Sequence, residues 1–197
     1  NRVDPLADAD VVETELMLAD LESLEKRIGP IEKKAKAGDK ESKAQFALME
    51  KILLPLREGR PARTASITAE EMPAFRALQL LTAKPVVYVC NVEEASAATG
   101  NAFSKMVEER AKAEGAVSVV ISAKIEAEFA GLPEADRSEF LESMGLEEPG
   151  LNRLIRAGYA LLDLVTYFTV GPKEARAWTI TRGTKAPQAA GVIHKDF

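Results

Sequence analysis

The chain has 197 residues, a formal net charge of −5 and a composition that is 46% hydrophobic and 29% charged. This length suffices for one large domain or two small ones with a real hydrophobic core, and the composition is ordinary for a soluble globular protein. The acidic balance argues against a generally basic nucleic-acid binder, although local basic patches remain compatible with it. The single cysteine excludes an intramolecular disulfide and fits a reducing compartment.

Targeting and phosphate-binding signals are missing from this sequence. No apolar run reaches the roughly 18 residues of a membrane span, and no signal peptide is visible, so we expect no membrane partner and a cytoplasmic location. The chain opens on Asn1 rather than Met and contains no G-x-x-x-x-G-K-[ST] loop. We therefore expect it to be an internal portion of a longer protein.

The first third of the sequence predicts a helical hairpin. Residues 2–8 are expected to be extended, and residues 11–37 and 40–58 to form two helical arms joined by a tight turn. Apolar residues recur at heptad spacings of three and four along both arms. They are Met17, Leu21, Leu24, Ile28, Ile31 and Ala35 in the first arm, and Phe46, Met49, Leu53 and Leu56 in the second. Pro30 is expected to interrupt and kink the first arm, and Pro55 to break the second near its end.

The outer positions of this hairpin are charged, with many lysines near the turn. They are Glu25, Lys26, Arg27, Glu32, Lys33, Lys34, Lys36, Lys40 and Lys43. Such a run usually forms a solvated face. A lysine-rich tip on a projecting arm can instead contact RNA phosphates.

A central strand follows the hairpin. After a loop at residues 59–66, Thr68 and Glu71 have capping-box spacing ahead of a helix expected to end near Thr82. Residues 86–90 are then continuously apolar, which predicts a strand buried on both faces. Its end switches abruptly to the polar run 91–94. Cys90 in this strand invites a redox interpretation, but a small buried hydrophobe is the alternative we favour.

A second strand completes a crossover. Residues 101–114 predict a helix, because apolar residues recur at helical spacing at Phe103, Met106, Val107 and Ala111. Gly115 suits the end of this helix. Residues 117–121 predict a buried strand that runs directly into Ser-Ala-Lys. Strand, helix and strand predict a parallel βαβ unit, so both polar strand ends should lie side by side, where α/β sheets bind ligands. The alternative for an Asn and Glu after a strand is an Asx-type turn entering a helix.

The last third predicts short helices and a two-stranded ribbon. Helices are expected at 126–130, 134–143 and 151–162, strands at 166–170 and 175–180, and a short helix at 188–194. Within the ribbon, Trp178 with Arg176 and Arg182 fits either an RNA-stacking patch or, as we favour, a core position for the tryptophan. The lone histidine, His194, argues against a histidine-based metal cluster or triad.

The two strand ends carry a family resemblance. Asn-x-x-acid at 91–94 and Ser-Ala-Lys at 122–124 resemble the two base-reading motifs of P-loop GTPases. In those proteins the first motif is normally Asn-Lys-x-Asp, whose Asp accepts hydrogen bonds from two neighbouring donors on guanine. This chain has Val92 for the Lys and the longer Glu94 for the Asp, which should crowd guanine, while adenine lacks the paired donors. The departure resembles the Obg-like ATPase family (YchF-type), which prefers ATP.

The resemblance extends nearly from end to end of the chain. Residues 2–8, 145–159, 166–180 and 183–197 also look like segments of that family. It implies an α/β fold: part of a P-loop GTPase-like parallel sheet, an inserted antiparallel helical hairpin (a coiled coil), and the start of a TGS domain, a ubiquitin-like β-grasp module. The implied domains are 1–9 with 64–163 for nucleotide binding, 10–63 for the hairpin and 164–197 for the TGS start.

The resemblance also implies a function and its residues. The longer protein would bind and hydrolyse ATP, or GTP, with Mg²⁺, and would associate with the ribosome or RNA. Asn91 would brace the loop and contact the base, and the amide and carbonyl of Val92 would meet the edge of adenine. Glu94 would disfavour guanine. The residues expected to close over the base are Ser122, Ala123 and Lys124.

No catalytic residue and no metal ligand are assigned to this chain, because the family's residues for those tasks lie outside it. Whether the chain itself is an enzyme is left open. The alternative is a non-enzymatic module in which the helical arm and the β-grasp element dock on the ribosome or RNA. The oligomeric state is also left open.

Overall fold

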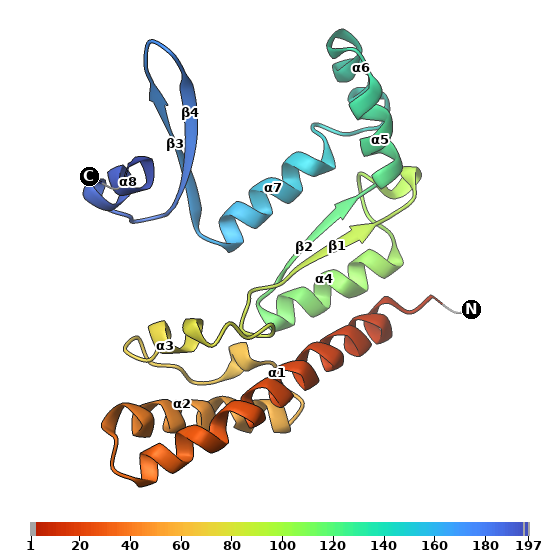
Figure 1. The fold of residues 1–197 in the computed structure, drawn as a ribbon. Coiled ribbons are helices and arrows are strands. Elements are labelled where there is room, and N and C mark those ends of the chain that lie inside the picture. Colours follow the sequence, from red (N-terminus) through yellow and green to blue (C-terminus); the bar gives the residue numbers. More distant parts are fainter. Residues whose placement is uncertain (1–2, 195, 197) are drawn as a thin grey trace. The chain divides into compact units, whose positions relative to one another are not determined.

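The computed structural model describes residues 3–194 and 196 and divides into two compact units, Asn1–Pro85 and Val86–Phe197. Each unit is described by itself. Figure 1 shows a helical first unit and a mixed α/β second unit. Positions 2, 195 and 197 of the predicted family segments lie outside the described residues.

Two long helices, α1 (Pro5–Lys36) and α2 (Lys40–Arg57), pack side by side in unit 1 and form the predicted hairpin (Figure 1). Asp4 accepts a hydrogen bond from the backbone amide of Ala7 at 3.1 Å and so begins α1. Proline suits the first helical position, so the expectation that residues 2–8 are extended is wrong from Pro5 onward. The chain reverses at Gly38, whose φ of +101° favours glycine.

Pro30 and Pro55 do not end the helices in which they lie, contrary to the predicted interruptions. A proline removes one helical hydrogen bond. Its neighbours are nevertheless held by tertiary packing, because Ile28 and Ile31 both contact the hydrophobic cluster between the arms. Packing of a helix face thus outweighs the local loss.

The core of unit 1 extends beyond the predicted seam. Its fully buried large side chains are Leu24, Met49, Ile52 and Leu53. Leu48 and Ile52 were not in the predicted seam. They are buried because α2 packs on two sides, against α1 and against the segment that follows it, residues 58–85. This returning segment carries Ala62, Phe75 and Leu80.

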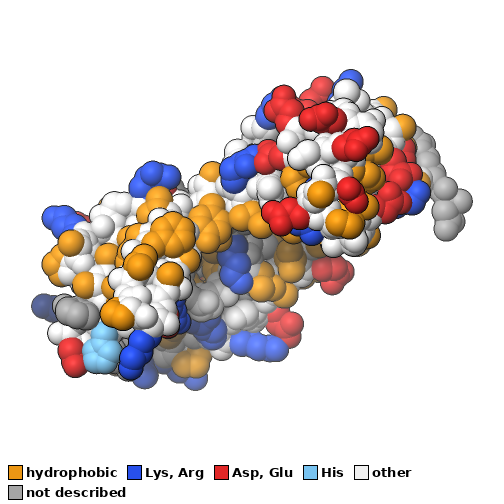
Figure 2. All heavy atoms as spheres, turned by 90° about the horizontal axis from the view of Figure 1, so that it is seen from above, with side chains coloured by type: hydrophobic (Ala, Val, Ile, Leu, Met, Phe, Trp, Pro, Cys, Tyr) orange, Lys and Arg blue, Asp and Glu red, His pale blue; other side chains and the backbone are white. Residues whose placement is uncertain are grey.

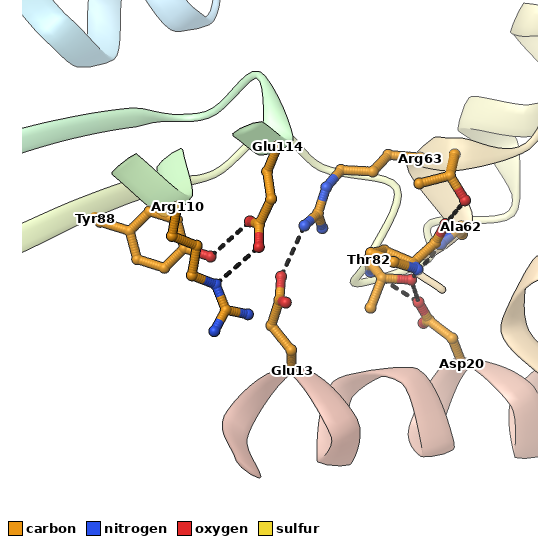
Figure 3. Close-up of polar contacts among 10 residues, drawn as sticks. Glu13, Asp20, Ala62, Arg63, Thr82, Tyr88, Arg110 and Glu114 are labelled. Atoms are coloured by element: carbon orange, nitrogen blue, oxygen red, sulfur yellow. Dashed lines mark hydrogen bonds and ion pairs between the residues drawn. The ribbon is translucent and has the colours of Figure 1, made fainter. Parts of the chain in front are cut away.

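A buried carboxylate joins α1 to this returning segment. Asp20 is 3% exposed and accepts hydrogen bonds from the backbone amides of Leu81 at 2.8 Å and Thr82 at 2.7 Å. The hydroxyl of Thr82 donates to the same carboxylate at 2.6 Å and accepts from the amide of Ala62 at 2.9 Å. Figure 3 shows this group beside the ion pair of Arg63 with Glu13, 2.7 Å, which is also within unit 1.

The returning segment contains a short helix, α3 (Met72–Ala77), preceded by a 3₁₀ turn at Ala62–Thr64. The predicted capping pair is present: the amide of Thr68 donates to the Glu71 carboxylate at 2.9 Å, and the Glu71 amide donates to the Thr68 hydroxyl at 3.3 Å. The predicted end near Thr82 is wrong. Gln79 has a left-handed φ of +57°, which turns the chain away from the helix.

The second unit is built around a parallel pair of strands, β1 (Val87–Asn91) and β2 (Val117–Ile121), connected by α4 (Ala102–Glu114). The predicted βαβ crossover is therefore present, with Gly115 ending α4 in a left-handed conformation, φ +67°. The expectation of burial on both faces is wrong: Val89 is 44% exposed. Within the described residues this sheet has only two strands, and both α4 and α7 contact it.

The remaining helices of this unit lie after β2. They are α5 (Ala123–Gly131), α6 (Arg137–Ser143), preceded by a 3₁₀ turn at Glu134–Asp136, and α7 (Gly150–Leu161). A further 3₁₀ turn at Glu94–Ser96 follows β1. The end of α4 is tied to β1 by Glu114, which accepts from the hydroxyl of Tyr88 at 2.8 Å and from Nε of Arg110 at 2.7 Å (Figure 3).

An antiparallel ribbon of β3 (Leu164–Val170) and β4 (Ala175–Thr181), followed by α8 (Ala186–Ile193), ends the chain. Trp178 is half-buried: its indole N–H donates to Thr169 at 2.9 Å, and the Arg176 guanidinium lies 4.2 Å from its ring centroid. One face of the ring is therefore already covered by a cation. Figure 2 shows apolar side chains at the surface among charged ones. In the ribbon, Phe168 is 72% exposed and Val170 is 83% exposed.

Candidate functional site

The parallel register brings the two polar motifs together. Asn91 lies opposite Ile121 at the ends of β1 and β2. The ladder continues one residue further, because the amide of Val92 donates to the carbonyl of Ile121 at 2.9 Å. The predicted proximity of residues 91–94 and 122–124 is therefore observed.

Asn91 joins the two motifs directly. Its side-chain Oδ1 accepts a hydrogen bond from the backbone amide of Ala123 at 2.9 Å. This contact fixes the orientation of the side-chain amide, whose nitrogen Nδ2 remains as a hydrogen-bond donor. The Val92 amide, expected to face a base, is instead used in the ladder to Ile121. That part of the prediction is corrected, because a strand extends its hydrogen-bonding pattern beyond its last apolar residue.

A second contact joins the motifs through opposite charges. The ammonium of Lys124 lies 2.9 Å from Oε2 of Glu94, with the side chains 67% and 36% exposed, respectively. The hydrogen bond to Glu94, with its charge, raises the pKa of Lys124 above its ordinary value. Lys124 is thus charged at neutral pH, and the carboxylate of Glu94 is already engaged.

Two adjacent glutamates in the first motif have different roles. Glu93 accepts from the hydroxyl of Ser96 and from Nδ2 of Asn101, the latter at 3.1 Å. The Ser96 hydrogen bond is the main cause of a pKa for Glu93 below its ordinary range. Glu93 therefore stabilises the turn that enters α4, as the Asx-type alternative expected, whereas Glu94 contacts the second motif.

Ser122 is the buried member of the second motif. It is 3% exposed, and its hydroxyl has no hydrogen-bond partner among the described residues. Its carbonyl accepts from the amide of Glu126 at 3.0 Å, which starts α5. Cys90, one residue before the first motif, is half-buried, and burial raises the pKa of its thiol. This favours the interpretation of Cys90 as a small hydrophobe rather than a reactive thiolate.

Sequence reasoning missed Glu126, which lies two residues after the second motif and binds the start of α7. The carboxylate of Glu126 accepts hydrogen bonds from the amides of Gly150 at 2.7 Å and Leu151 at 3.1 Å, the first two residues of α7. A carboxylate at a helix N-terminus is favourable for the helix dipole. No local signal marks this contact, because 24 residues separate the partners.

The groups at the two strand ends are polar and hydrogen-bonding. No group of three or more His, Cys, Asp or Glu side chains in this part of the chain could hold a metal ion. No helix in the described residues is long and apolar enough to cross a membrane. What the strand ends present is an amide nitrogen, a paired carboxylate and ammonium, and a buried hydroxyl.

Comparison with known proteins gives matches along the whole chain. The family model YchF-GTPase_C, described as a protein of unknown function (DUF933), matches residues 164–197. The ribosome-binding ATPase YchF of Haemophilus influenzae is 50% identical over 196 residues, which cover 100% of this chain and 54% of that protein. The Bacillus subtilis protein of the same name is 43% identical over 198 residues, with the same coverage.

The structure of the Schizosaccharomyces pombe YchF GTPase superposes on this chain with a TM-score of 0.86 at 33% sequence identity. The match covers 100% of this chain and 54% of that one, so the chain spans about half the length of the relatives it matches. Its fold is therefore the α/β fold of a protein solved as a GTPase. It is YchF-like over its whole length, and the resemblance to the Obg-like ATPase family (YchF-type) is confirmed.

Proposed function

We propose that this chain carries the base-recognition part of a YchF-type ATPase that binds and hydrolyses purine nucleotides, ATP in preference to GTP. The observation that carries the proposal is the joining of the two motifs by the Asn91–Ala123 and Glu94–Lys124 contacts at one edge of the sheet. The printed names of the relatives, ribosome-binding ATPase and GTPase, support the same class of activity.

The arrangement gives each residue a role in this proposal. Asn91 donates from Nδ2 to an acceptor on the base, since its oxygen is held by Ala123. Lys124 flanks the base, and Ser122, which is buried, caps the helix that carries Lys124. Guanine presents two adjacent donors that need a free carboxylate, and here the ammonium of Lys124 competes for Glu94. Adenine has no such pair of donors, so it loses nothing from this competition.

The binding free energy available from contacts with a base limits what this chain can do without a phosphate site. Each hydrogen bond to a base contributes about 1 kcal/mol, whereas a millimolar complex requires about 4 kcal/mol. We therefore expect base binding by this chain alone to be weak. Hydrolysis also requires a phosphate cradle, Mg²⁺ to neutralise developing charge, and a positioned water. None of these tasks is assigned to a residue of this chain.

Base preference can be tested on the chain itself by titrating an isotope-labelled sample with AMP and GMP and following its amides by NMR. AMP should shift the amides around Asn91 and Lys124 more than GMP does. The double change Val92→Lys with Glu94→Asp restores the guanine-reading motif and should reverse this order. The expected change in relative affinity is about tenfold, equivalent to about one hydrogen bond to a charged group.

The matched control for this experiment is Glu93→Asp. It shortens the neighbouring glutamate by the same methylene, but Glu93 faces Ser96 and Asn101 rather than the second motif. It should leave the AMP-to-GMP ratio unchanged. Equal discrimination by the parent chain and the double variant would show that the motif has been misassigned.

A second function, docking on the ribosome or RNA, is favoured by the lysines at the hairpin turn and does not require enzymatic activity. Lys33, Lys34 and Lys40 are exposed, and Lys36 is exposed but pairs with Glu32 at 2.7 Å. Exposed ammonium groups on a protruding turn can neutralise phosphates. In this proposal docking occurs in the cytoplasm, and residues 164–197, as the start of a TGS domain, provide a second contact.

Reversing charge at this turn tests the docking proposal. The triple change Lys33→Glu, Lys34→Glu and Lys36→Glu should weaken co-sedimentation with ribosomes by at least about tenfold at low salt, since it replaces attraction to phosphates by repulsion. A charge-matched control changes Lys84, Lys105 and Lys173, which are exposed elsewhere on the chain. Unchanged pelleting of the first variant, or equal loss in both, would exclude the turn as a docking site.

A further inference from the structure

Unit 1 contains a groove between α2 and the start of α3, and Glu41 in its lining directly follows Lys40 of the hairpin turn. Its volume is about 450 Å³. The floor is apolar and small: Ala44 and Leu48 come from α2, Ala74 from α3, and Leu78 from the end of α3. Leu48 and Leu78 belong to the buried core, so the floor is a continuation of it.

The walls of the groove are acidic on both sides. Glu41 lies in the first turn of α2, and Glu70 and Glu71 lie just before α3. Glu71 is paired with Lys51, at 2.7 and 2.8 Å. Glu41 and Glu70 are exposed, and neither has an ion-pair partner among the residues that the structure describes. Arg27 is the single cation of the lining, so the lining has three carboxylates and one guanidinium.

The groove is also held open by fixed contacts. The guanidinium of Arg27 donates to the carbonyl of Leu78 at 3.2 Å, which ties α1 to the end of α3. Lys51 and the Thr68 amide both bind Glu71, which ties α2 to the start of α3. A site held in its binding shape loses less entropy when it is occupied.

We propose that this groove docks a basic amphipathic helix of a partner protein, with apolar side chains on the Ala44–Leu48 floor and lysine or arginine side chains against Glu41 and Glu70. Helix-in-groove recognition combines an apolar stripe with polar edges, and here both edges select positive charge. RNA phosphates would be repelled by the same carboxylates. The groove and the lysine-rich turn therefore select partners of opposite charge.

The proposal can be tested with a defined probe on the intact chain. The probe is an acetylated and amidated helical peptide of about four turns, with leucines spaced three and four apart and lysines beside them. NMR titration should show shifts concentrated at the amides of Ala44, Leu48 and Ala74, with an affinity that weakens as salt is added. A peptide with glutamate in place of every lysine should cause no such shifts.

Two charge-matched double variants isolate the role of the walls. Glu41→Gln with Glu70→Gln should weaken peptide binding by roughly threefold to tenfold, since two exposed pairs are lost. Glu15→Gln with Glu50→Gln changes the net charge equally, at exposed positions outside the groove, and should change affinity by less than about twofold. Equal weakening by both doubles would overturn the proposal in favour of diffuse attraction to an acidic surface.

Filling the groove tests its shape without changing charge. Ala74 is exposed and lines the groove, so Ala74→Phe should fold normally and reduce peptide binding by about tenfold or more. Its helix content and unfolding midpoint show directly that the fold is kept. Full binding by this variant would overturn the proposal. The proposal would also be overturned if the peptide caused no shifts at about 1 mM, or if RNA oligonucleotides shifted the groove amides.

Discussion

Replacing Asp20 by Ala should lower the free energy of unfolding of unit 1 by about 3–5 kcal/mol. The carboxylate accepts three hydrogen bonds, from the amides of Leu81 and Thr82 and from the Thr82 hydroxyl. Without it, the Thr82 amide and hydroxyl, which are buried, and the partly buried Leu81 amide lose their hydrogen-bond acceptor. Urea unfolding of the whole chain, followed by the helical circular dichroism signal, measures the loss.

Two further variants separate this role from the general effect of changing α1. Asp20→Asn keeps one oxygen acceptor but places an N–H group among donors, so its loss should be smaller than that of alanine yet still above about 1 kcal/mol. Glu15 on the same helix is exposed, so Glu15→Ala should change the free energy of unfolding by less than about 0.5 kcal/mol. A loss below 1 kcal/mol for Asp20→Ala would contradict the assignment of Asp20 as the link between α1 and the returning segment.

Gly150→Ala should destabilise the chain by about 1–3 kcal/mol, although alanine is normally the better helix former. A Cβ atom at this position would lie 2.9 Å from Oε1 of Glu126 and 2.9 Å from Cγ2 of Ile121. Relief of the clash requires α7 to move away from β2 or Glu126 to release its hydrogen bonds. Thermal unfolding of the parent chain and of the variant measures this difference in stability.

Gly158 provides the matched control in the same helix. Nothing lies within 4 Å of a Cβ atom built there, and its φ is not in the left-handed region. Gly158→Ala should therefore stabilise the chain by up to about 1 kcal/mol through helix propensity alone. Opposite signs for the two substitutions are expected. A stabilising Gly150→Ala would show that the close packing of α7 on β2 is absent.

Periodicity in the sequence was sufficient for the parallel pair of strands and for the buried seam of the helical hairpin. The apolar runs before Asn91 and Ser122 predict two parallel strands, and the register of those strands brings their polar ends together. The spacing of Leu24 and Leu53 predicts their place between two helical arms, where both are fully buried. These features depend on local patterns with a regular repeat.

Contacts between residues distant in the sequence were not predictable in the same way. Asp20 is polar, and the partners that explain its burial lie 61 and 62 residues away. The Glu126 carboxylate likewise binds the amide of Gly150, and no sequence pattern links these two residues. At the site, the Val92 amide was misjudged because a strand end does not show how far its hydrogen bonding continues.

The cap on α7 has a mechanical consequence for unit 2. A helix of 12 residues is a stiff rod about 18 Å long. Its first turn is tied to α5 by the Glu126 carboxylate, and β3 begins three residues after its end. A rod of this length turns a tilt of about 5° at one end into a displacement of about 1.5 Å at the other. Two hydrogen bonds to the Glu126 side chain therefore help to fix the position of the β3–β4 ribbon relative to the ends of β1 and β2.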